Sequence, residues 1–387
     1  MVASDGSSEV NFDVNESILK HVASLKPWFP KQVIICTGEY LTRILQKPSF
    51  GKETNDRVPV FIGKNGQETM NLQQAGLEPD SILGLDEDVD THFWFNALEY
   101  FTKNDNLTTY FKNKSLDKVR EALIVASIWD GVGSAMLPTL VSKLKASNTK
   151  VVVFAVLPSA AQPPDAQFNA YSALGLCAAE NFAPILLMRR DYLDCYVGVD
   201  QKGSTITSNA VLDYILEMVL AKQKSFVHEI SELAKPFNVR MFAVLSATGA
   251  SLKIYGSFEN VLNAALSKPF SEFDLSRALV AYVLIRVPSQ FKSKLAKGKI
   301  ELAVAKWFET KVKLKGICVS EPTYVEGSSD RVEVVMFVGS LDIAKLFPSI
   351  ERETSAIKAH AIEQGLMKKA DWQVIVKNLG KEEDKPV

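Results

Sequence analysis

The chain has 387 residues, of which 47% are hydrophobic and 23% charged, and its formal net charge is -1. This composition is typical of a globular protein long enough for two domains, and it excludes a largely disordered chain. A net charge near zero gives no general attraction to nucleic acid, so we expect no nucleic-acid partner. The one lysine cluster, Lys292–Lys299, is expected to be a solvated surface.

The amino-terminal stretch Met1–Val10 is acidic and polar and lacks a signal-peptide pattern. No apolar run approaches the roughly 20 residues that a transmembrane helix needs. We therefore expect a cytoplasmic protein without a transmembrane segment, and the charged tail Lys381–Val387 identifies no membrane adaptor. The cysteines form no Cys-x-x-Cys pair and the histidines show no metal-ligand spacing, so we expect free thiols and no metal site.

The first half of the chain alternates short apolar runs with helical patterns. The apolar runs are Val33–Cys36, Leu123–Ser127, Val151–Leu157 and Ile185–Met188, and the helical patterns include Met136–Ala146 and Asp165–Ala179. Continuous apolar runs of this length are typical of parallel strands buried on both faces. The pattern predicts a Rossmann-like, doubly wound α/β domain. Residues 47–90 are rich in Gly, Pro, Asn and Asp and are expected to form irregular loops.

Asn209–Ala221 is apolar around nearly its whole helical surface, with Asp213 and Glu217 on the one polar stripe. Such a helix is expected to be buried on most sides, as a central helix between two domains would be.

The strand-like segments after this helix alternate with helical ones, and the partly alternating Arg331–Val338 suits a half-exposed strand. The strand-like segments are Val239–Leu245, Ala278–Val287 and Arg331–Val338, and the helical ones are Asn260–Lys268 and Ile300–Glu309. They predict a smaller α+β domain with a mixed sheet and helices on one side. We therefore expect a nucleotide-binding-like domain at 8–205, the central helix and connecting loop at 206–235, the α+β domain at 236–345, and a carboxy-terminal helix and tail at 346–387.

The stretch Ala122–Leu140 joins an apolar run to a short glycine loop and then a helical pattern. The amino terminus of a helix offers unpaired N–H groups and a partial positive charge, and glycines before it let the backbone approach phosphate oxygens. Gly131 and Gly133 suit this role, and Ser134 suits either helix capping or a bond to phosphate. Pro138 is expected in the first helical turn. No Walker lysine and no Gly-x-Gly-x-x-Gly follow, so the loop predicts a phosphate cradle without naming the ligand.

The order of segments resembles the tubulin/FtsZ superfamily over roughly residues 8–345. Trp129–Ala135 falls where that family places its Gly-Gly-Gly-Thr-Gly loop, and Pro184–Leu193 is similar to its base-contacting segment. Pro164–Leu174 resembles the tubulin Pro-Tyr-Asn-Ala stretch, and Asn209–Ala221 the family's central helix. Ser320–Val338 is similar to the hairpin that closes the family's activation domain. The resemblance implies a GTPase-type domain that binds GTP with Mg²⁺, a following activation domain, and head-to-tail assembly with itself or a related protein.

The family's first phosphate loop has a Gly-Gly-x-Gly-Asn pattern. The best counterpart in this sequence is Val10–Ile18, which contains no glycine and carries Asp13 and Glu16. Side chains there would hold the backbone away from phosphate, and two like charges about 4 Å apart repel by about 4 kcal/mol at an effective dielectric of about 20. The sequence therefore predicts weakened nucleotide binding.

Other departures fall at the fourth loop and the base loop. Asp130 adds a further negative charge, Val132 removes a hydroxyl, and Ala135 replaces a glycine. Arg190 stands where the family has Asn, whereas Asn209 matches the central-helix Asn that faces guanine in tubulins. The nucleotide-contacting residues implied by the resemblance are therefore Gly131, Gly133, Ser134 and Asn209.

The family hydrolyses GTP with acidic residues of an Asn-x-Asp loop supplied by the next subunit. Lys222–Ser231 contains no such motif, and His228 and Glu229 are the nearest candidates for orienting water. A polar residue at the start of a helix is the alternative interpretation of both. We expect GTP hydrolysis to be absent or very slow.

Three hypotheses follow from the sequence. The first is a divergent tubulin/FtsZ-like cytoskeletal protein that binds GTP weakly and assembles head to tail with impaired hydrolysis. The second is a nucleotide-free pseudo-GTPase of the same fold that acts as a scaffold or assembly partner. The third is an unrelated α/β enzyme whose glycine loop holds another phosphorylated ligand.

Overall fold

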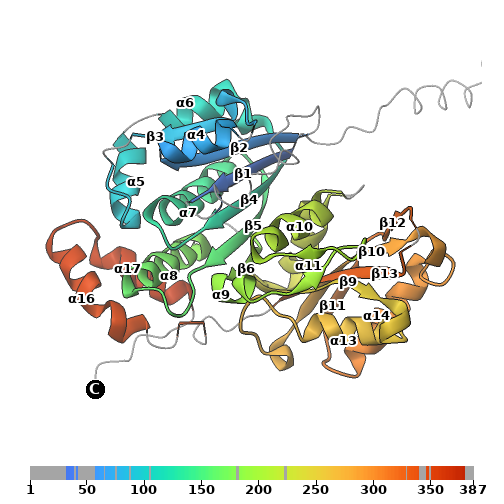
Figure 1. Ribbon diagram of the computed structural model, residues 1–387. Helices are drawn as coiled ribbons and strands as arrows, with labels where there is room; N and C mark the ends of the chain where they lie inside the picture. The colour runs from blue at the N-terminus through green and yellow to red at the C-terminus, as the bar shows by residue number, and fades with distance from the viewer. Residues whose placement is uncertain are drawn as a thin grey trace, which may run out of the picture. The chain divides into compact units, whose positions relative to one another are not determined.

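The structure is a computed structural model that describes residues 32–38, 41, 57–64, 66–74, 76–86, 89–103, 106–179, 183–221, 225–327, 329–339, 346–347 and 350–379. Residues 31–387 form one compact unit by their contacts. Within the described ranges, eleven strands form one sheet in the order β11-β10-β13-β9-β6-β5-β4-β1-β2-β3, with β12 paired to β10 (Figure 1). The strands are β1 (Gln32–Thr37), β2 (Arg57–Lys64), β3 (Ile82–Leu85), β4 (Glu121–Ser127), β5 (Lys150–Leu157), β6 (Ile185–Arg189), β9 (Met241–Ser251), β10 (Val280–Pro288), β11 (Gly316–Val319), β12 (Thr323–Val325) and β13 (Arg331–Gly339).

The first six strands, β1 to β6, pair only in parallel. Their two faces are buried by different helices, because alternate residues of each strand pack into separate clusters. One face is covered by α5 (Trp94–Lys103), α6 (Asn106–Asn113), α7 (Gly131–Ala146), α8 (Pro164–Ala179), α16 (Ile350–Glu363) and α17 (Lys369–Asn378). The other is covered by α4 (Gln67–Gln74), α10 (Ser208–Leu220) and α11 (Phe226–Ala234). The prediction of a doubly wound domain is therefore confirmed.

The expectation of irregular loops across residues 47–90 is wrong for the described part of that segment. Residues 57–64 form β2, residues 67–74 form α4 and residues 82–85 form β3, which together build the end of the sheet beyond β1. The core of β2 is the short apolar run Val58–Ile62. The residues on either side of this run are typical of loops, so the composition of the whole segment 47–90 did not indicate a strand. Residues 47–56 lie outside the described part of the chain.

The second half of the sheet is mixed, as predicted, because β13 pairs antiparallel with both β9 and β10. One face of these strands packs against α13 (Phe258–Leu266) and α14 (Lys297–Glu309), and the other continues the surface beneath α10 and α11. The predicted hairpin at Ser320–Val338 is wrong. β12 instead pairs in parallel with β10, because β13 is already bonded to β9 and β10 along both edges.

The helix α10 is buried as the sequence predicted. Val211, Leu212, Ile215 and Leu216 are fully buried in a cluster that includes residues from both halves of the sheet. Of the two predicted polar residues, Asp213 is buried and Glu217 is exposed. The sheet runs without interruption past this helix, and the predicted domain boundaries stay a prediction.

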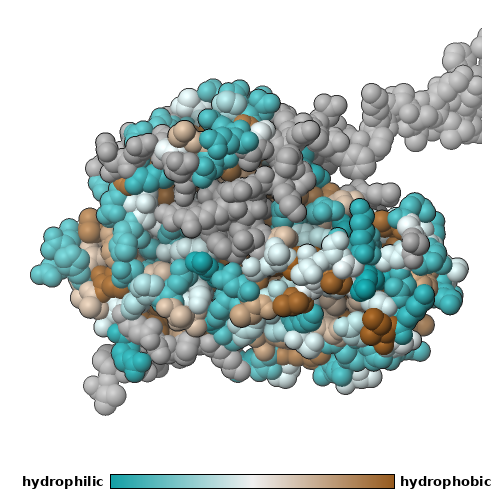
Figure 2. Space-filling view, viewed as in Figure 1, coloured by the Kyte–Doolittle hydropathy of each residue, from teal (hydrophilic) through white to brown (hydrophobic). Residues whose placement is uncertain are grey.

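The surface in the view of Figure 2 carries scattered hydrophobic residues among hydrophilic ones. None of the helices within the described ranges is both long enough and apolar enough to cross a membrane. The four cysteines are free, with Cys36 and Cys177 buried, Cys195 exposed and Cys318 half-buried. Among the described residues, no three His, Cys, Asp or Glu side chains are grouped to hold a metal ion.

Candidate functional site

The loop that joins β4 to α7 lies at the point where the strand order reverses. β1 and β4 are adjacent in the sheet, and the chain runs outward from them to β2 and β3 on one side and to β5 and β6 on the other. Open α/β sheets bind their ligands at such a switch point, outside the carboxyl ends of the strands. The predicted phosphate cradle is therefore at the position where this architecture binds ligands.

The glycines of this loop are required by contacts within the chain. A Cβ on Gly133 would lie 1.8 Å from the carbonyl oxygen of Ser127, and one on Gly131 would lie 2.4 Å from the carbonyl oxygen of Thr91. Gly38, which follows β1, has a φ of +96°, and its Cβ would lie 2.1 Å from the Ser127 hydroxyl. Only glycine fits at these three positions, because Ser127 at the end of β4 lies too close to Gly38 and Gly133, and Thr91 and Phe93 lie too close to Gly131, for a side chain.

Three of the N–H groups at the start of α7 are bonded to the protein itself. The Gly133 N–H donates to Oδ1 of Asp130 over 2.8 Å, so Asp130 is the N-cap of the helix. The Gly131 N–H donates to the Thr91 carbonyl (2.8 Å), and the Ser134 N–H donates to the Asp130 carbonyl (3.1 Å). Ser127 adds a hydroxyl bond to Oδ2 of Asp130 over 3.2 Å. The buried carboxylate of Asp130 thus takes the place in which a helix amino terminus would bind a phosphate oxygen.

A second segment, Thr91–Trp94, lies against this helix start. The side chain of Asn169 on α8 holds it there, since it accepts from the Trp94 N–H and donates to the carbonyls of His92 and Trp129. The imidazole of His92 also bonds Asp165 over 2.7 Å. The segment closes the cradle from the side of α5 and α8.

The predicted cofactor-binding residues are partly brought together. Gly131, Gly133 and Ser134 share the first turn of α7. Of the two roles that the sequence left open for Ser134, capping is excluded, because its hydroxyl donates to the Ile128 carbonyl (2.9 Å) while Asp130 caps the helix, and a bond to phosphate stays a prediction. Pro138 lies inside α7 and not in its first turn, because the helix begins at Gly131. The backbone of Asn209 lies in the first turn of α10, and its side chain is outside the described part of the structure.

The base-loop residue Arg190 begins the short helix α9 (Arg190–Asp194) directly after β6. Its guanidinium lies 5.5 Å from the ring centroid of Trp129 and pairs with Asp194 at 3.4 Å. Arg190 therefore packs against the glycine loop through a cation–π contact. The predicted first-loop counterpart, Val10–Ile18, lies outside the described residues. By strand order, the loop after the first described strand begins at Gly38, so that loop does contain a glycine.

The weak catalytic candidates lie on α11, near the amino ends of the strands. Nδ1 of His228 lies 2.5 Å from the ammonium group of Lys150, the first residue of β5. Lys150 also pairs with Glu232 at 2.7 Å. Glu229 accepts a bond from the Tyr282 hydroxyl over 2.6 Å, and burial raises the pKa of that tyrosine. Within one molecule these residues lie at the opposite ends of the strands from the α7 cradle, and a catalytic role for them stays a prediction.

Sequence reasoning missed how Asp130 acts. It was treated only as a charge that repels phosphate, although an Asp three residues before an N–H at a helix start is a capping signal. The contributions of Ser127, Thr91 and Asn169 carry no local sequence signal, because they come from three separate segments.

Two solved structures share this fold over nearly their whole length. CetZ from Methanosaeta thermophila strain DSM 6194 matches with a TM-score of 0.66 and 16% identity, covering 89% of this chain and 97% of that one. The GDP-bound monomer of CetZ1 from Haloferax volcanii matches with a TM-score of 0.66 and 16% identity, covering 85% of this chain and 99% of that one. No protein-family model and no curated protein matches the sequence. The chain therefore has the fold of the tubulin/FtsZ superfamily, which confirms the resemblance predicted from the order of its segments.

Proposed function

We propose that this chain of the tubulin/FtsZ fold is a pseudo-GTPase, an assembly partner or scaffold that works without bound guanine nucleotide. The observation that supports it is the carboxylate of Asp130, which accepts the Gly133 N–H at the start of α7. A phosphate would have to displace this carboxylate or lie beside it. At about 4 Å the two charges repel by about 4 kcal/mol at an effective dielectric of about 20, which corresponds to a loss of about a thousandfold in affinity.

The packing around the loop supports the same proposal. Gly131 and Gly133 are fitted against backbone carbonyls of the chain, so their small size is explained without a ligand. The segment held by Asn169 would also have to move before a phosphate reached the Gly131 N–H, which donates to Thr91.

Absent or very slow hydrolysis is part of the proposal. His228 contacts the ammonium group of a lysine, and Glu229 accepts from the hydroxyl of Tyr282. A group that orients water needs a free acceptor directed at the attacking molecule. Recruitment of either residue by a neighbouring subunit would require these contacts to break.

Head-to-tail assembly, either with itself or with a related protein, is the contact that this fold supports best. Such an interface joins two different surfaces of the molecule and propagates into a filament when rotation does not close it. The two surfaces we propose are the carboxyl end of the parallel strands, near Asp130, and the opposite end, near α11. The exposed Lys150–His228–Glu232 cluster gives the second surface charged groups that suit a polar contact.

Weak GTP binding with impaired hydrolysis is the second candidate. It is supported by the shared fold of CetZ1, whose structure is GDP-bound, and by the glycines at the strand-order switch point. It requires Asp130 and the Thr91–Trp94 segment to move. The hypothesis of an unrelated α/β enzyme loses its support, because the fold is that of the tubulin/FtsZ superfamily.

Calorimetric titration with GTP, GDP and ATP, each with Mg²⁺, tests the proposal. We expect no binding, with CetZ1 from Haloferax volcanii as the positive control for GDP. A ligand at one hundred times its Kd stabilises a protein by about 2.7 kcal/mol, so a thermal-shift assay checks the result independently. Stabilisation by guanine nucleotides alone would overturn the pseudo-GTPase proposal in favour of weak GTP binding.

Sedimentation and electron microscopy test assembly separately. We expect filaments or co-assembly that do not depend on added nucleotide. Lys150→Glu is expected to weaken this assembly. Lys202→Glu, which lies elsewhere on the surface, is the control and is expected to leave it unchanged. Assembly that requires GTP would contradict nucleotide independence. A monomer at all concentrations and with every candidate partner would contradict the assembly role.

A further inference from the structure

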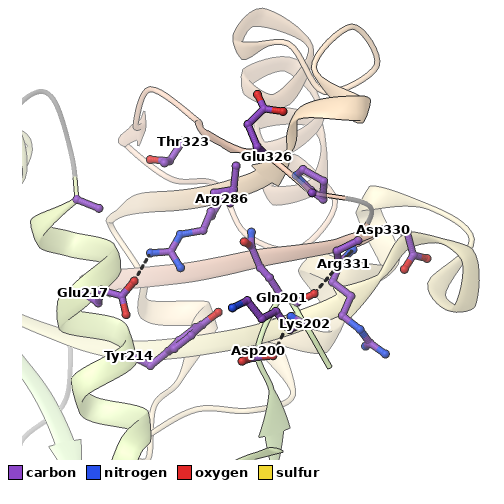
Figure 3. Close-up of a pocket in the computed structure, with 15 residues that line it drawn as sticks. Asp200, Gln201, Lys202, Tyr214, Glu217, Arg286, Thr323, Glu326, Asp330 and Arg331 are labelled. Carbon is purple, nitrogen blue, oxygen red and sulfur yellow. Dashed lines mark hydrogen bonds and ion pairs between the residues drawn. The ribbon is translucent and has the colours of Figure 1, made fainter. Parts of the chain in front are cut away.

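A cavity of about 880 Å³ lies beside α10, away from the glycine loop. Its lining comes from α10, from the ends of β10 and β12, and from the turns at residues 200–202 and 326–331. Figure 3 shows Arg286 reaching from β10 toward Glu217 on α10, with Gln201 and Lys202 between Arg286 and Arg331. A volume of this size is typical of pockets for small molecules.

Arg286 is the buried cation of this cavity, with only 8% of the residue exposed. Among the described residues, its guanidinium makes one hydrogen bond, 3.4 Å long, to Glu217. It also lies 3.3 Å from Oε2 of Glu333 and 5.7 Å from the ring centroid of Tyr214. A guanidinium has five N–H donors, so most of the donors of Arg286 remain available to a ligand.

Three neighbouring side chains have buried polar atoms that make no hydrogen bond within the described part of the chain. They are Nε2 of Gln201, the hydroxyl of Tyr214 and both carboxyl oxygens of Glu333, a residue that is fully buried. Buried polar groups are nearly always hydrogen-bonded, because an unpaired one costs about 1–3 kcal/mol. Two of these side chains, Gln201 and Tyr214, line the cavity, and their unpartnered atoms point to a bound molecule that supplies the missing partners.

The acidic side chains at the rim already accept hydrogen bonds from the protein. Asp200 accepts from the N–H groups of Lys202 and Ser204, each over 2.8 Å. Asp330 accepts from Ser251 and Lys253, and Glu326 accepts from the hydroxyl of Ser289. The polar groups left for a ligand are therefore mostly donors, namely Arg286, Gln201, Tyr214 and the exposed ammonium of Lys202.

We infer that this cavity binds a small molecule that carries an oxyanion, a carboxylate or a phosphoryl group, held by Arg286 with Gln201 and Tyr214 as further donors. Glu217 exchanges with the ligand, because it is exposed and its bond to Arg286 is long. Burial, with a smaller contribution from Asp200, raises the pKa of Glu333 to about 9, so at neutral pH its carboxyl is protonated and does not repel the anion. This site does not depend on the proposed loss of nucleotide binding.

Calorimetry on the full chain tests the inference with inorganic phosphate, succinate and citrate as probes, and with dimethyl succinate as the uncharged counterpart of succinate. We expect at least one anion to bind and the ester not to bind, and the preferred anion identifies the carboxylate or the phosphoryl class. No binding at millimolar concentrations, or equal binding of succinate and its ester, would overturn the inference.

Variants then locate the bound anion. Arg286→Met combined with Glu333→Gln, which keeps position 333 neutral at every pH, is expected to weaken binding by about ten- to a hundredfold. Tyr214→Phe removes only the unpartnered hydroxyl and is expected to weaken binding by about two- to tenfold. Arg277→Met, an exposed arginine with a side chain 55% accessible, is the matched control and should leave affinity unchanged. Affinity that is equal in the wild type and in Tyr214→Phe and the double variant would overturn the assignment of the site.

Discussion

The cradle at the start of α7 and the cavity beside α10 differ in how their buried polar groups are partnered. At the cradle, the N–H groups of Gly131, Gly133 and Ser134 all donate to oxygens of the chain. At the cavity, buried atoms of Gln201 and Tyr214 have no hydrogen-bond partner among the described residues. These three backbone N–H groups are thus bonded within the chain, whereas the unpartnered side chains of Gln201 and Tyr214 line a cavity. The first site is identified by its position in the fold. The second is identified by buried polar atoms that lack a hydrogen-bond partner.

The largest effect is expected at the glycine whose Cβ would meet backbone. Gly133→Ala puts a methyl group 1.8 Å from the Ser127 carbonyl oxygen, and neither β4 nor α7 can move without disturbing the core. We expect it to destabilise the chain by about 3 kcal/mol or more, measured by chemical denaturation. The control is Gly298→Ala in α14, where the Cβ meets open space and a gain of about 0.5–1 kcal/mol is expected. A tolerated Gly133→Ala would mean that the cradle is looser than its contacts indicate.

Next in size is the pH dependence that Glu333 gives to the cavity region. Its folded pKa is raised from 4.5 to about 9, so the folded chain holds a proton that the unfolded chain releases in this range. The stability that this carboxyl contributes is fully present below pH 4.5 and is lost as the pH rises toward about 9. The largest slope for one proton is about 1.4 kcal/mol per pH unit.

Glu333→Gln keeps the shape and removes the titration. We expect the free energy of unfolding of the wild type to fall by about 2 kcal/mol relative to the variant between about pH 5 and pH 6.5. Denaturant titrations at several pH values measure this difference. Parallel curves for the two proteins would show that the carboxyl is ionised in the fold and paired with Arg286.

A smaller effect is expected from the cap that closes the cradle. Asp130→Ala leaves the Gly133 N–H without its acceptor and should cost about 1–2 kcal/mol. Asp130→Asn retains an oxygen acceptor without the charge, and it should remain within about 0.5 kcal/mol of the wild type. Thermal and chemical denaturation compare the two. Equal losses in both variants would mean that the carboxylate charge, and not the cap geometry, stabilises the cradle.

The smallest effect is expected at an unpartnered hydroxyl. Tyr214→Phe removes a group with no partner in the described structure, so the stability without ligand should change by less than about 0.5 kcal/mol. Tyr282→Phe is the contrasting variant, because its hydroxyl donates to Glu229, and it should cost about 1 kcal/mol. If both substitutions cost the same in denaturant titrations, the loss of a partnered hydroxyl would not differ from the loss of an unpartnered one, which would contradict the comparison.

Much of the fold could be predicted because its signals are local. The continuous runs at β1, β4, β5 and β6 mark strands buried on both faces, and the apolar surface of α10 marks a buried helix. The partner of β12 had no such signal, since strand pairing depends on contacts between distant segments. The candidate site was likewise predicted only in part. The glycine loop was visible in the sequence, and the oxygens that satisfy its N–H groups were not.

The sequence by itself determined the order of the elements, the resemblance to the tubulin/FtsZ superfamily and the position of a loop with the glycines of a phosphate cradle. Hydrophobic periodicity, the positions of glycines and the order of segments depend on residues close together in the chain, so they can be recognised without a structure. Only the tertiary structure decided that Asp130 caps the helix at the cradle and that Arg286, Gln201 and Tyr214 line one cavity. Burial and hydrogen-bond partnership join residues that are far apart in the chain, and they determine whether a polar group is satisfied by the protein or is left for a ligand.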